Sequence, residues 1–198
     1  VLAADMIFAV GGGRAIDTCK TASDKIDKPL FTFPTIASNC AAVTLVCVMH
    51  NLDRSLAGFH YRKEPAKHCF INLDIISKAP LEYIWAGIGD AFSKAYEPPF
   101  SAMNDELDHS NMIGVDLAKI GVDLAKHCGE PLFKYAVQAY DDCKNQRASE
   151  ALKHIVLNIV ITGGIISTLI ETEKYNGAIP HSIFYGSTPI PACEQNHL

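Results

Sequence analysis

The chain has 198 residues, of which 48% are hydrophobic and 20% are charged, and its formal net charge is −5. That composition is ordinary for a globular protein with one large domain or two small ones. The negative charge argues against a general affinity for nucleic acid or for acidic membranes, so we expect neither as a partner.

The chain enters its first apolar segment almost at once, without an initiator methionine, a signal peptide or a transit segment. Residues 196–198 have no tail character either. We therefore expect both ends to be cuts through a longer chain.

Residues 1–79 alternate short apolar runs with turn residues, which is typical of an α/β unit with a parallel sheet. The apolar run at residues 6–10 is stopped by three glycines and is expected to be a strand buried on both faces of that sheet. A helix is predicted from Arg14 to about Ile26. Further strands are predicted at residues 29–33, 43–49 and 69–73.

Residues 80–198 are expected to be all helical, so a domain boundary is predicted near residue 79. Pro80 suits the first turn of a helix that runs to about Glu97, and Ser77 is close enough to cap it.

Residues 113–126 read Ile-Gly-Val-Asp-Leu-Ala-Lys twice in succession. On a helix, this spacing places four apolar residues on one stripe, namely Ile113, Leu117, Ile120 and Leu124. Two heptads are too few to sustain a coiled coil, so the stripe is predicted to face the core of a helical bundle.

A third long helix is predicted from Ser149, as its N-cap, to about Glu171. It contains the most apolar stretch of the chain, residues 155–170, which Asn158, Thr162 and two glycines interrupt. Because a membrane span needs about 20 apolar residues, we predict a buried core helix instead.

The chain has seven cysteines, an odd number, and no C-x-x-C pair. A disulfide framework favours an even count, and a structural zinc site favours paired spacings. We therefore expect reduced thiols and a cytoplasmic protein.

Gly11, Gly12 and Gly13 follow the first predicted strand and open the first predicted helix. Without Cβ atoms the backbone can approach a pyrophosphate closely, and the first N–H groups and the dipole of the helix favour an anion. The spacing differs from the common G-x-G-x-x-G, so a nucleotide-binding turn and a simple tight turn both stay open.

Five sequence blocks, in order along nearly the whole chain, narrow this choice. They are Gly-Gly-Gly-Arg-Ala-Ile-Asp-Thr-Cys-Lys at 11–20, Pro-Thr-Ile-Ala-Ser at 34–38, Asp-Ile-Ile-Ser-Lys-Ala-Pro at 74–80, Ala-Gly-Ile-Gly-Asp at 86–90 and Pro-His-Ser-Ile-Phe-Tyr-Gly-Ser-Thr at 180–188. Together they resemble the iron-containing alcohol dehydrogenase superfamily, and its glycerol dehydrogenases in particular. The resemblance implies a dehydroquinate synthase-like architecture, in which a partial Rossmann-like NAD(P)-binding domain at 1–79 precedes a partial all-α, metal-binding and catalytic domain at 80–198.

In that family the glycine turn holds the pyrophosphate of NAD or NADP, which assigns Gly11–Gly13 to the cofactor. By the same resemblance, Thr35 and Ser38 would lie near it. Asp17 is one helical turn in from the phosphates, which its carboxylate would repel. It is expected either to point toward the ribose or nicotinamide, or to order the turn.

The resemblance makes Asp90 and His181 catalytic residues, as two of the three protein ligands of a divalent metal, with zinc preferred over iron. Asp90 is predicted mid-helix in an apolar stretch, where a carboxylate without a partner is costly to bury. The alternatives are a helix-surface aspartate and, for His181, a structural histidine. The third ligand would be His197 or a residue beyond Leu198.

The implied reaction is the NAD(P)-linked interconversion of a small secondary alcohol or polyol, such as glycerol, and its ketone, with the metal acting as a Lewis acid. Glycerol dehydrogenases typically carry a polyol-contacting aspartate two residues after the serine that Ser38 matches. Cys40 stands there in this chain, and a thiol cannot accept hydrogen bonds from a diol as a carboxylate can. A 2-hydroxy acid or 2-oxo acid dehydrogenase is therefore the alternative within the family.

Two further alternatives stay open. One is a truncated homologue that folds but catalyses nothing. The other is a relative with a phosphate-bearing ligand, such as a sugar-phosphate dehydrogenase or a dehydroquinate synthase-like lyase, which would be expected to carry more basic residues near Asp90 than Lys94 alone. The expected partners are a small alcohol or ketone and further copies of the chain in a homo-oligomer.

Overall fold

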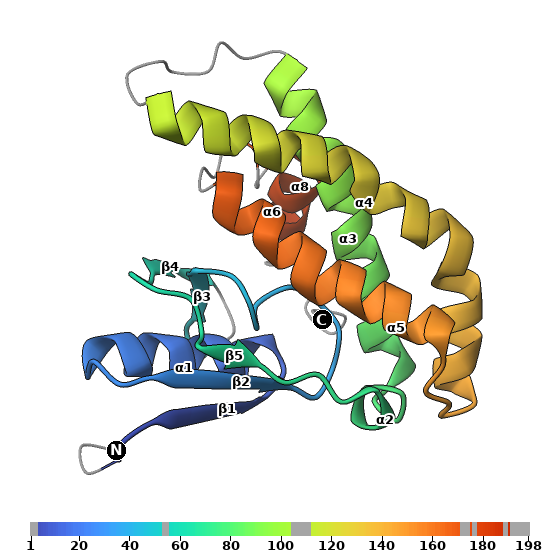
Figure 1. Cartoon of the computed structure of the whole chain (residues 1–198), viewed down its shortest axis with the longest axis horizontal. Coiled ribbons are helices and arrows are strands. Elements are labelled where there is room, and N and C mark those ends of the chain that lie inside the picture. Colours follow the sequence, from blue (N-terminus) through green and yellow to red (C-terminus); the bar gives the residue numbers. More distant parts are fainter. Residues whose placement is uncertain are drawn as a thin grey trace.

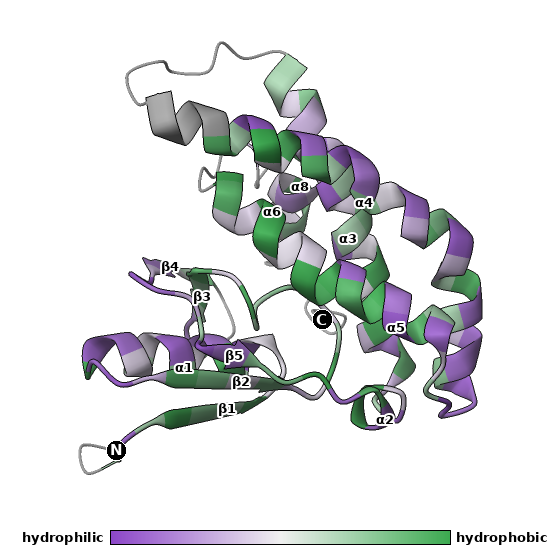
Figure 2. Ribbon diagram, in the orientation of Figure 1, coloured by the Kyte–Doolittle hydropathy of each residue, from purple (hydrophilic) through white to green (hydrophobic). Residues whose placement is uncertain are grey.

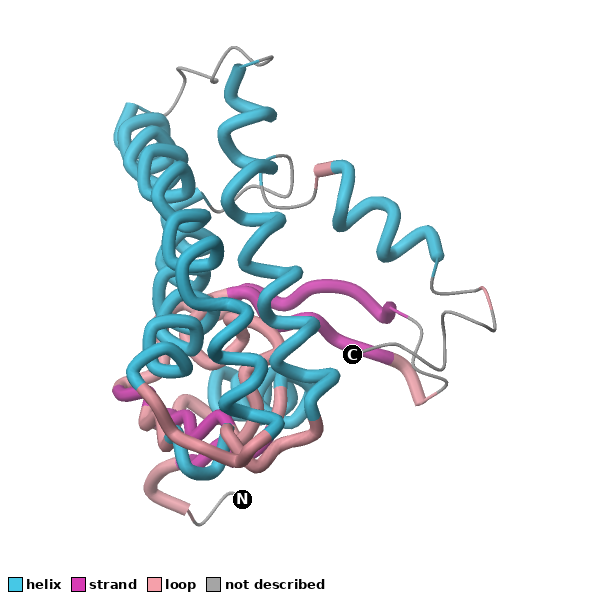
Figure 3. Tube along the Cα trace, turned by 90° about the vertical axis from the view of Figure 1, so that its right-hand side faces the viewer, coloured by secondary structure: helices cyan, strands magenta, loops and turns pink. Residues whose placement is uncertain are grey.

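The computed structural model describes residues 4–52, 56–103, 112–170, 175, 178–187 and 190. A small α/β layer at the N-terminal end of the chain lies beside a layer of long helices (Figure 1). In the view of Figure 3, the long helices rise from the α/β layer and run alongside one another.

A three-stranded parallel sheet contains β1 (Ile7–Gly11), β2 (Leu30–Pro34) and β5 (His68–Cys69), in that order. The connection from β1 to β2 is α1 (Gly13–Lys25), which packs against both strands. Gly11 pairs with Pro34, so β1 and β2 end at the same edge of the sheet. Parallel strands joined through a helix confirm the predicted α/β class.

One face of this sheet is exposed. Ala9, Leu30 and Thr32 are buried, whereas Phe8 and Val10 on the opposite face of β1 are 57% and 61% exposed. The prediction that the first strand is buried on both faces is therefore wrong for this chain. The reason is that, within the described part of the chain, α1 is the helix that packs extensively against β1.

The antiparallel pair of β3 (Val46–His50) and β4 (Leu56–Tyr61) is separate from the parallel sheet. The strand predicted at 43–49 is thus shorter than expected and lies in another sheet. The sequence pattern does not predict β4, because Gly58, with a φ of 140°, interrupts its apolar run. The strand predicted at 69–73 is also mostly wrong, since a short helix, α2 (Leu73–Ile76), starts where it was expected to end.

The first long helix, α3 (Leu81–Met103), starts where the sequence predicts but extends past the predicted end at Glu97. It continues through Pro98 and Pro99, although proline removes hydrogen bonds from a helix, and α3 as a whole packs extensively on α4. Ser77 does not cap α3; it is the C-cap residue of α2.

The second long helix, α4 (Met112–Lys144), is a bundle helix, as the seven-residue repeat predicts, but it turns a different face inward. Leu117 and Ile120 of the predicted stripe are 42% and 56% exposed. Leu124 is partly buried, and the side chain of Ile113 lies outside the described residues. The buried residues of the repeat are small or β-branched: Ala118, Gly121, Val122 and Ala125. They allow α4 to approach its neighbours closely, which the larger stripe would prevent.

The predicted third helix is confirmed as a continuous run of α5 (Glu150–Leu157), the π-helical turn η1 (Asn158–Thr162) and α6 (Gly163–Ile170). Ser149 caps it as predicted, because its hydroxyl accepts the Leu152 N–H at 3.0 Å. By length and composition this run could cross a membrane. Most of its apolar residues are buried in the core instead, as the sequence predicts, although Leu157 and Ile165 are 40% and 41% exposed. Figure 2 shows the hydropathy of the residues along this run.

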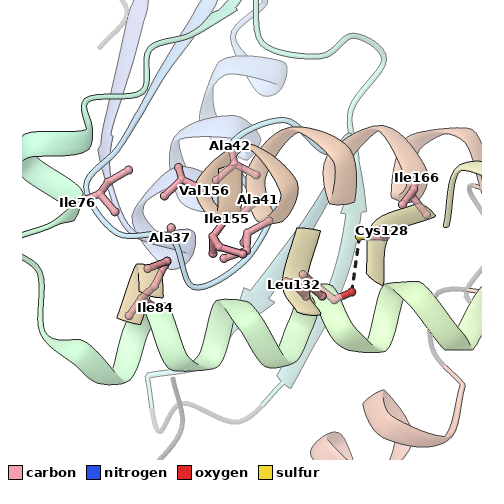
Figure 4. Packing of buried hydrophobic residues seen from close by; sticks show 14 of the residues in the cluster. Ala37, Ala41, Ala42, Ile76, Ile84, Cys128, Leu132, Ile155, Val156 and Ile166 are labelled. Carbon is pink, nitrogen blue, oxygen red and sulfur yellow. Dashed lines mark hydrogen bonds between the residues drawn. The ribbon is translucent and has the colours of Figure 1, made fainter. Parts of the chain in front are cut away.

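In the described part of the chain, one hydrophobic cluster joins the two layers. Ala37 and Ala41, from the segment after β2, belong to the same buried cluster as Ile84 of α3 and Ile155 of α5 (Figure 4). The long helices therefore pack directly on the segment that follows β2. The domain boundary near residue 79 stays a prediction. The last described helix, α8 (Ile179–Ser187), contacts α3.

Candidate active site

The carboxyl ends of β1 and β2 bring two of the predicted cofactor segments together. The backbone N–H of Thr35 donates to the carbonyl of Gly11 at 3.1 Å. Ser38, in the same segment, is 8% exposed. In α/β sheets the edge at the carboxyl ends of the strands is the usual place for a ligand.

The glycine turn packs against that neighbouring segment. Gly11 has a φ of 147°, which other residues rarely adopt. A Cβ atom on Gly12 would lie 2.6 Å from the Ile36 side chain, and one on Gly13 would lie 2.7 Å from the Asn39 side chain. Gly12 is also the N-cap residue of α1 and provides no side-chain cap. The first N–H groups of α1 can therefore bind an anion.

Asp17 is turned into the protein. It is 5% exposed, and its carboxylate accepts hydrogen bonds from Lys20 Nζ at 2.8 Å and from the Val48 N–H at 3.1 Å. Lys20 Nζ also donates to the Ala41 carbonyl at 2.9 Å and the Thr44 hydroxyl at 3.1 Å. Burial raises the pKa of Asp17, and the Lys20 ammonium opposes that rise. The pair ties α1 to the segment before β3, which favours the ordering role over contact with the cofactor.

Asp90, the first predicted metal ligand, lies on α3 where this helix meets the segment after β2. A Cβ atom on Gly87 would lie 1.9 Å from the Ala37 carbonyl oxygen, so α3 touches the backbone between Thr35 and Ser38. Asp90 follows within one helical turn, and its side chain is 20% exposed. The contact places the predicted metal ligand beside the predicted cofactor segment.

His181 faces Asp90 from another helix. It lies in the first turn of α8, which agrees with the predicted junction of loop and helix. Its Nε2 atom is 3.7 Å from Asp90 Oδ1. Two ligands of a tetrahedral zinc with bonds of about 2.1 Å are about 3.4 Å apart, so these two atoms fit a shared metal ion.

Glu97 is not among the predicted site residues, yet it contacts the other ring nitrogen of His181. Glu97 Oε2 lies 2.7 Å from His181 Nδ1, and Oε1 accepts the His181 backbone N–H at 3.2 Å. Burial disfavours a charged imidazole, but hydrogen bonding to Asp90 and Glu97 outweighs it and raises the pKa of His181 to about 9. The signal that could have revealed Glu97 is its place two helical turns after Asp90, on the same face of α3.

Cys40 lies in the segment after β2 and packs beside α6. It is 8% exposed, and its Sγ atom is 3.8 Å from Ser167 Oγ on α6. Burial and the negative charge of Asp90 raise the pKa of the Cys40 thiol to about 11, while the positive charge of Lys94 opposes the rise. The thiol is therefore neutral at physiological pH and within electrostatic reach of both charges.

Among the described residues, no group of three His, Cys, Asp or Glu side chains is close enough to hold a metal ion. His197, the candidate third ligand, lies outside those residues, as does Thr188 at the end of the fifth sequence block. The third ligand therefore stays a prediction. The cysteines of the described part are free thiols, as expected.

The chain resembles known proteins over nearly its whole length. The sequence pattern of the iron-containing alcohol dehydrogenase family matches residues 1–80. The chain is 27% identical over 191 residues to hydroxycarboxylate dehydrogenase A of Escherichia coli strain K12, a match that covers 96% of this chain and 51% of that protein. It is 26% identical over 185 residues to a glycerol dehydrogenase of Thermotoga maritima, with 93% and 48% covered. It is 34% identical over 175 residues to a glycerol-1-phosphate dehydrogenase of Thermococcus sibiricus, with 88% and 46% covered. The chain thus spans about half the length of these relatives.

Solved structures share the fold. A probable glycerol dehydrogenase from Sinorhizobium meliloti 1021 matches with a TM-score of 0.79 at 21% identity, over 94% of this chain and 50% of that one. The sulfoacetaldehyde reductase of Bifidobacterium kashiwanohense, solved in complex with NAD+, matches with a TM-score of 0.64 at 20% identity, over 94% and 49%. These likenesses confirm the predicted architecture, an α/β part followed by helices.

Proposed function

We propose that the protein containing this chain is an NAD(P)- and metal-dependent oxidoreductase acting on a small alcohol, because residues 1–80 match the sequence pattern of the iron-containing alcohol dehydrogenase family and the chain resembles dehydrogenases over nearly its whole length. The observation that carries the proposal is the contact between Gly87 and the Ala37 carbonyl. Through that contact Asp90 and His181 stand beside the segment that packs on the glycine turn. Hydride transfer needs a substrate site next to a nicotinamide site. The contact supports this, because the proposed metal ligands and the proposed cofactor segment are on the two elements that it joins.

The cofactor would bind along the edge of the sheet. Gly11–Gly13 and the N-terminus of α1 would hold the pyrophosphate of NAD or NADP through backbone N–H groups. Thr35 and Ser38 would lie along the rest of the cofactor. The protein's share in the reaction is to fix the carbinol carbon against the ring and to exclude water.

Asp90 and His181 fit a divalent metal, zinc or iron, because they offer one carboxylate oxygen and one imidazole nitrogen 3.7 Å apart. Such a metal, when bound, supplies Lewis-acid polarisation of the alcohol oxygen. Asp90 would contribute the negative charge, and His181 would contribute the lone pair of Nε2, which must give up its proton when the metal binds. We propose that the third ligand is His197 or a residue of the longer protein.

Cys40 favours a second candidate within the same family, a 2-hydroxy acid dehydrogenase. A neutral thiol at this position cannot accept hydrogen bonds from a polyol as a carboxylate can. Without a carboxylate there, the site carries one negative charge fewer, which makes it more favourable for an anionic substrate. The likeness to hydroxycarboxylate dehydrogenase A supports this candidate.

An assay of the full-length protein separates the two candidates. Turnover is measured with NAD and with NADP, in zinc or in iron, across glycerol, small diols and 2-hydroxy acids. Metal-dependent oxidation of a polyol would support the first candidate, and that of a hydroxy acid the second. Absence of metal-dependent turnover with every substrate would overturn the proposal.

We further propose that the protein works in the cytoplasm as a homo-oligomer, with a small alcohol or ketone as its partner and neither nucleic acid nor membrane. The net charge of −5 supports the absence of nucleic acid binding. Light scattering of the full-length protein measures the oligomeric state.

A further inference from the structure

We infer that Glu97 is a positioning residue, which fixes the ring of His181 so that Nε2 faces Asp90 and the metal. The inference rests on the proposed function, because it assigns a role to a residue beside the proposed metal site. It is carried by the two-point contact between the Glu97 carboxylate and His181.

The contact fixes both the position and the tautomer of the imidazole. One carboxylate oxygen accepts the backbone N–H of His181 at 3.2 Å, and the other lies 2.7 Å from Nδ1. An ionised carboxylate can only accept hydrogen bonds, so Nδ1 must carry the proton. In a neutral imidazole, the lone pair is then on Nε2, the nitrogen that lies 3.7 Å from Asp90 Oδ1.

Burial makes this arrangement rigid. Glu97 is 3% exposed and comes from α3, the same helix as Asp90. Two turns of one helix therefore supply both a metal ligand and the group that orients the second ligand. Carboxylates that accept the second N–H of a metal-bound histidine are a general feature of metal sites, and their removal weakens metal binding by about 10- to 100-fold.

Replacing Glu97 with glutamine tests the role with little change in shape. An amide has one acceptor oxygen and one donor nitrogen, so in this two-point arrangement it can accept only one of the two His181 N–H groups. If the amide nitrogen faces Nδ1, the imidazole must shift its proton to Nε2. That proton would then occupy the position where the metal should bind.

The zinc dissociation constant is measured for the full-length protein by competition with a chromophoric chelator. Wild type is compared with Glu97→Gln, Glu97→Leu and Glu82→Gln, the last being the same change at an exposed position of α3. We expect about 10-fold weaker zinc binding for Glu97→Gln and up to about 100-fold for Glu97→Leu. Glu82→Gln should bind zinc as wild type does.

The outcomes distinguish the role of Glu97 from the proposed function itself. If wild type binds no zinc or iron, the proposed metal site fails. If wild type and Glu97→Gln bind zinc equally, the positioning role is overturned. A purely structural role would lower the melting temperature of the metal-free Glu97→Gln variant and leave its zinc affinity unchanged. Should Glu97→Leu not fold, Glu97→Gln alone decides the question.

Discussion

Lys20 is 1% exposed, and among the residues that the structure describes, its ammonium pairs with the Asp17 carboxylate. Replacing Asp17 with asparagine would leave that ammonium buried without a counter-charge. Breaking a buried ion pair in this way costs about 3–5 kcal/mol, so Asp17→Asn should lower the free energy of unfolding by about that amount. Urea unfolding of the full-length protein measures the loss.

The matched control is Asp27→Asn, the same change at an exposed position just after α1. It should alter the free energy of unfolding by less than about 0.5 kcal/mol. If Asp17→Asn were as stable as this control but bound NAD more weakly, Asp17 would be a cofactor residue rather than an ordering one.

The positions of site residues along the helices could be predicted from the sequence more easily than the directions of their side chains. The pattern that contains Asp17 places it one turn into α1, but it does not show that Lys20, one turn later, draws the carboxylate inward. The role of Glu97 could not be predicted for a similar reason. Its partner, His181, lies far along the chain, and no local spacing connects the two.

At the scale of elements, the approach of α3 to the segment after β2 depends on Gly87. A Cβ atom there would meet the Ala37 carbonyl oxygen at 1.9 Å, and this atom belongs to the backbone and cannot rotate away. Gly87→Ala should destabilise the fold by about 1–3 kcal/mol and separate the proposed metal ligands from the cofactor segment. Thermal unfolding and NAD titration measure the two effects.

Gly89 provides the matched control, because a Cβ atom there meets nothing within 4 Å. Gly89→Ala should stabilise α3 by about 0.5–1 kcal/mol, since alanine is the better helix former. Equal effects at both glycines would contradict the idea that a close approach, rather than helix propensity, explains Gly87.

Asp142 holds the turn between α4 and α5. Its buried carboxylate accepts hydrogen bonds from Gln138, Arg147 and Ser149. Burial alone would raise the pKa of Asp142, but these hydrogen bonds outweigh burial and lower it. A carboxyl with a lowered pKa stabilises the fold above its unfolded-state pKa, about 4, and loses that contribution as the pH falls through the folded-state value.

Asp142→Asn should therefore lower the free energy of unfolding at pH 7 by about 1–3 kcal/mol. The deficit relative to wild type should shrink as the pH falls below about 4, because the wild-type carboxyl of the unfolded chain then takes up a proton and the charged folded-state carboxyl no longer favours folding. Urea unfolding at several pH values measures it, with Asp141→Asn at the exposed neighbouring position as the control. A deficit that stays constant down to pH 2 would rule out the charge as its cause.

Elements with a strong local pattern could be predicted, and those that depend on distant packing could not. The glycines fix the end of β1 and the start of α1, and Ser149 fixes the start of α5. The heptad repeat indicates a helix correctly but points to the wrong face, because Leu117 and Ile120 are exposed while small residues pack inward. The choice of face depends on how closely α3 and α6 approach, which the repeat does not encode.

At the scale of the whole molecule, the proposed metal would join two helices that are far apart in the sequence. Asp90 lies on α3 and His181 on α8. A ligand that binds only the folded state stabilises it, by about 2.7 kcal/mol when its concentration is 100 times its dissociation constant. Zinc should therefore raise the free energy of unfolding of the full-length protein by about that amount, and a chelator should reverse it.

Asp90→Asn should abolish this zinc effect, because an amide is a poor replacement for a carboxylate ligand. The variant keeps the free thiols and the other histidines, so any zinc that these groups bind, in the folded or the unfolded chain, affects wild type and variant alike. Unfolding of wild type and Asp90→Asn in zinc and in chelator therefore isolates the proposed site. An equal zinc effect in the two proteins would mean that the stabilising ion binds elsewhere and that α3 and α8 are held together without it.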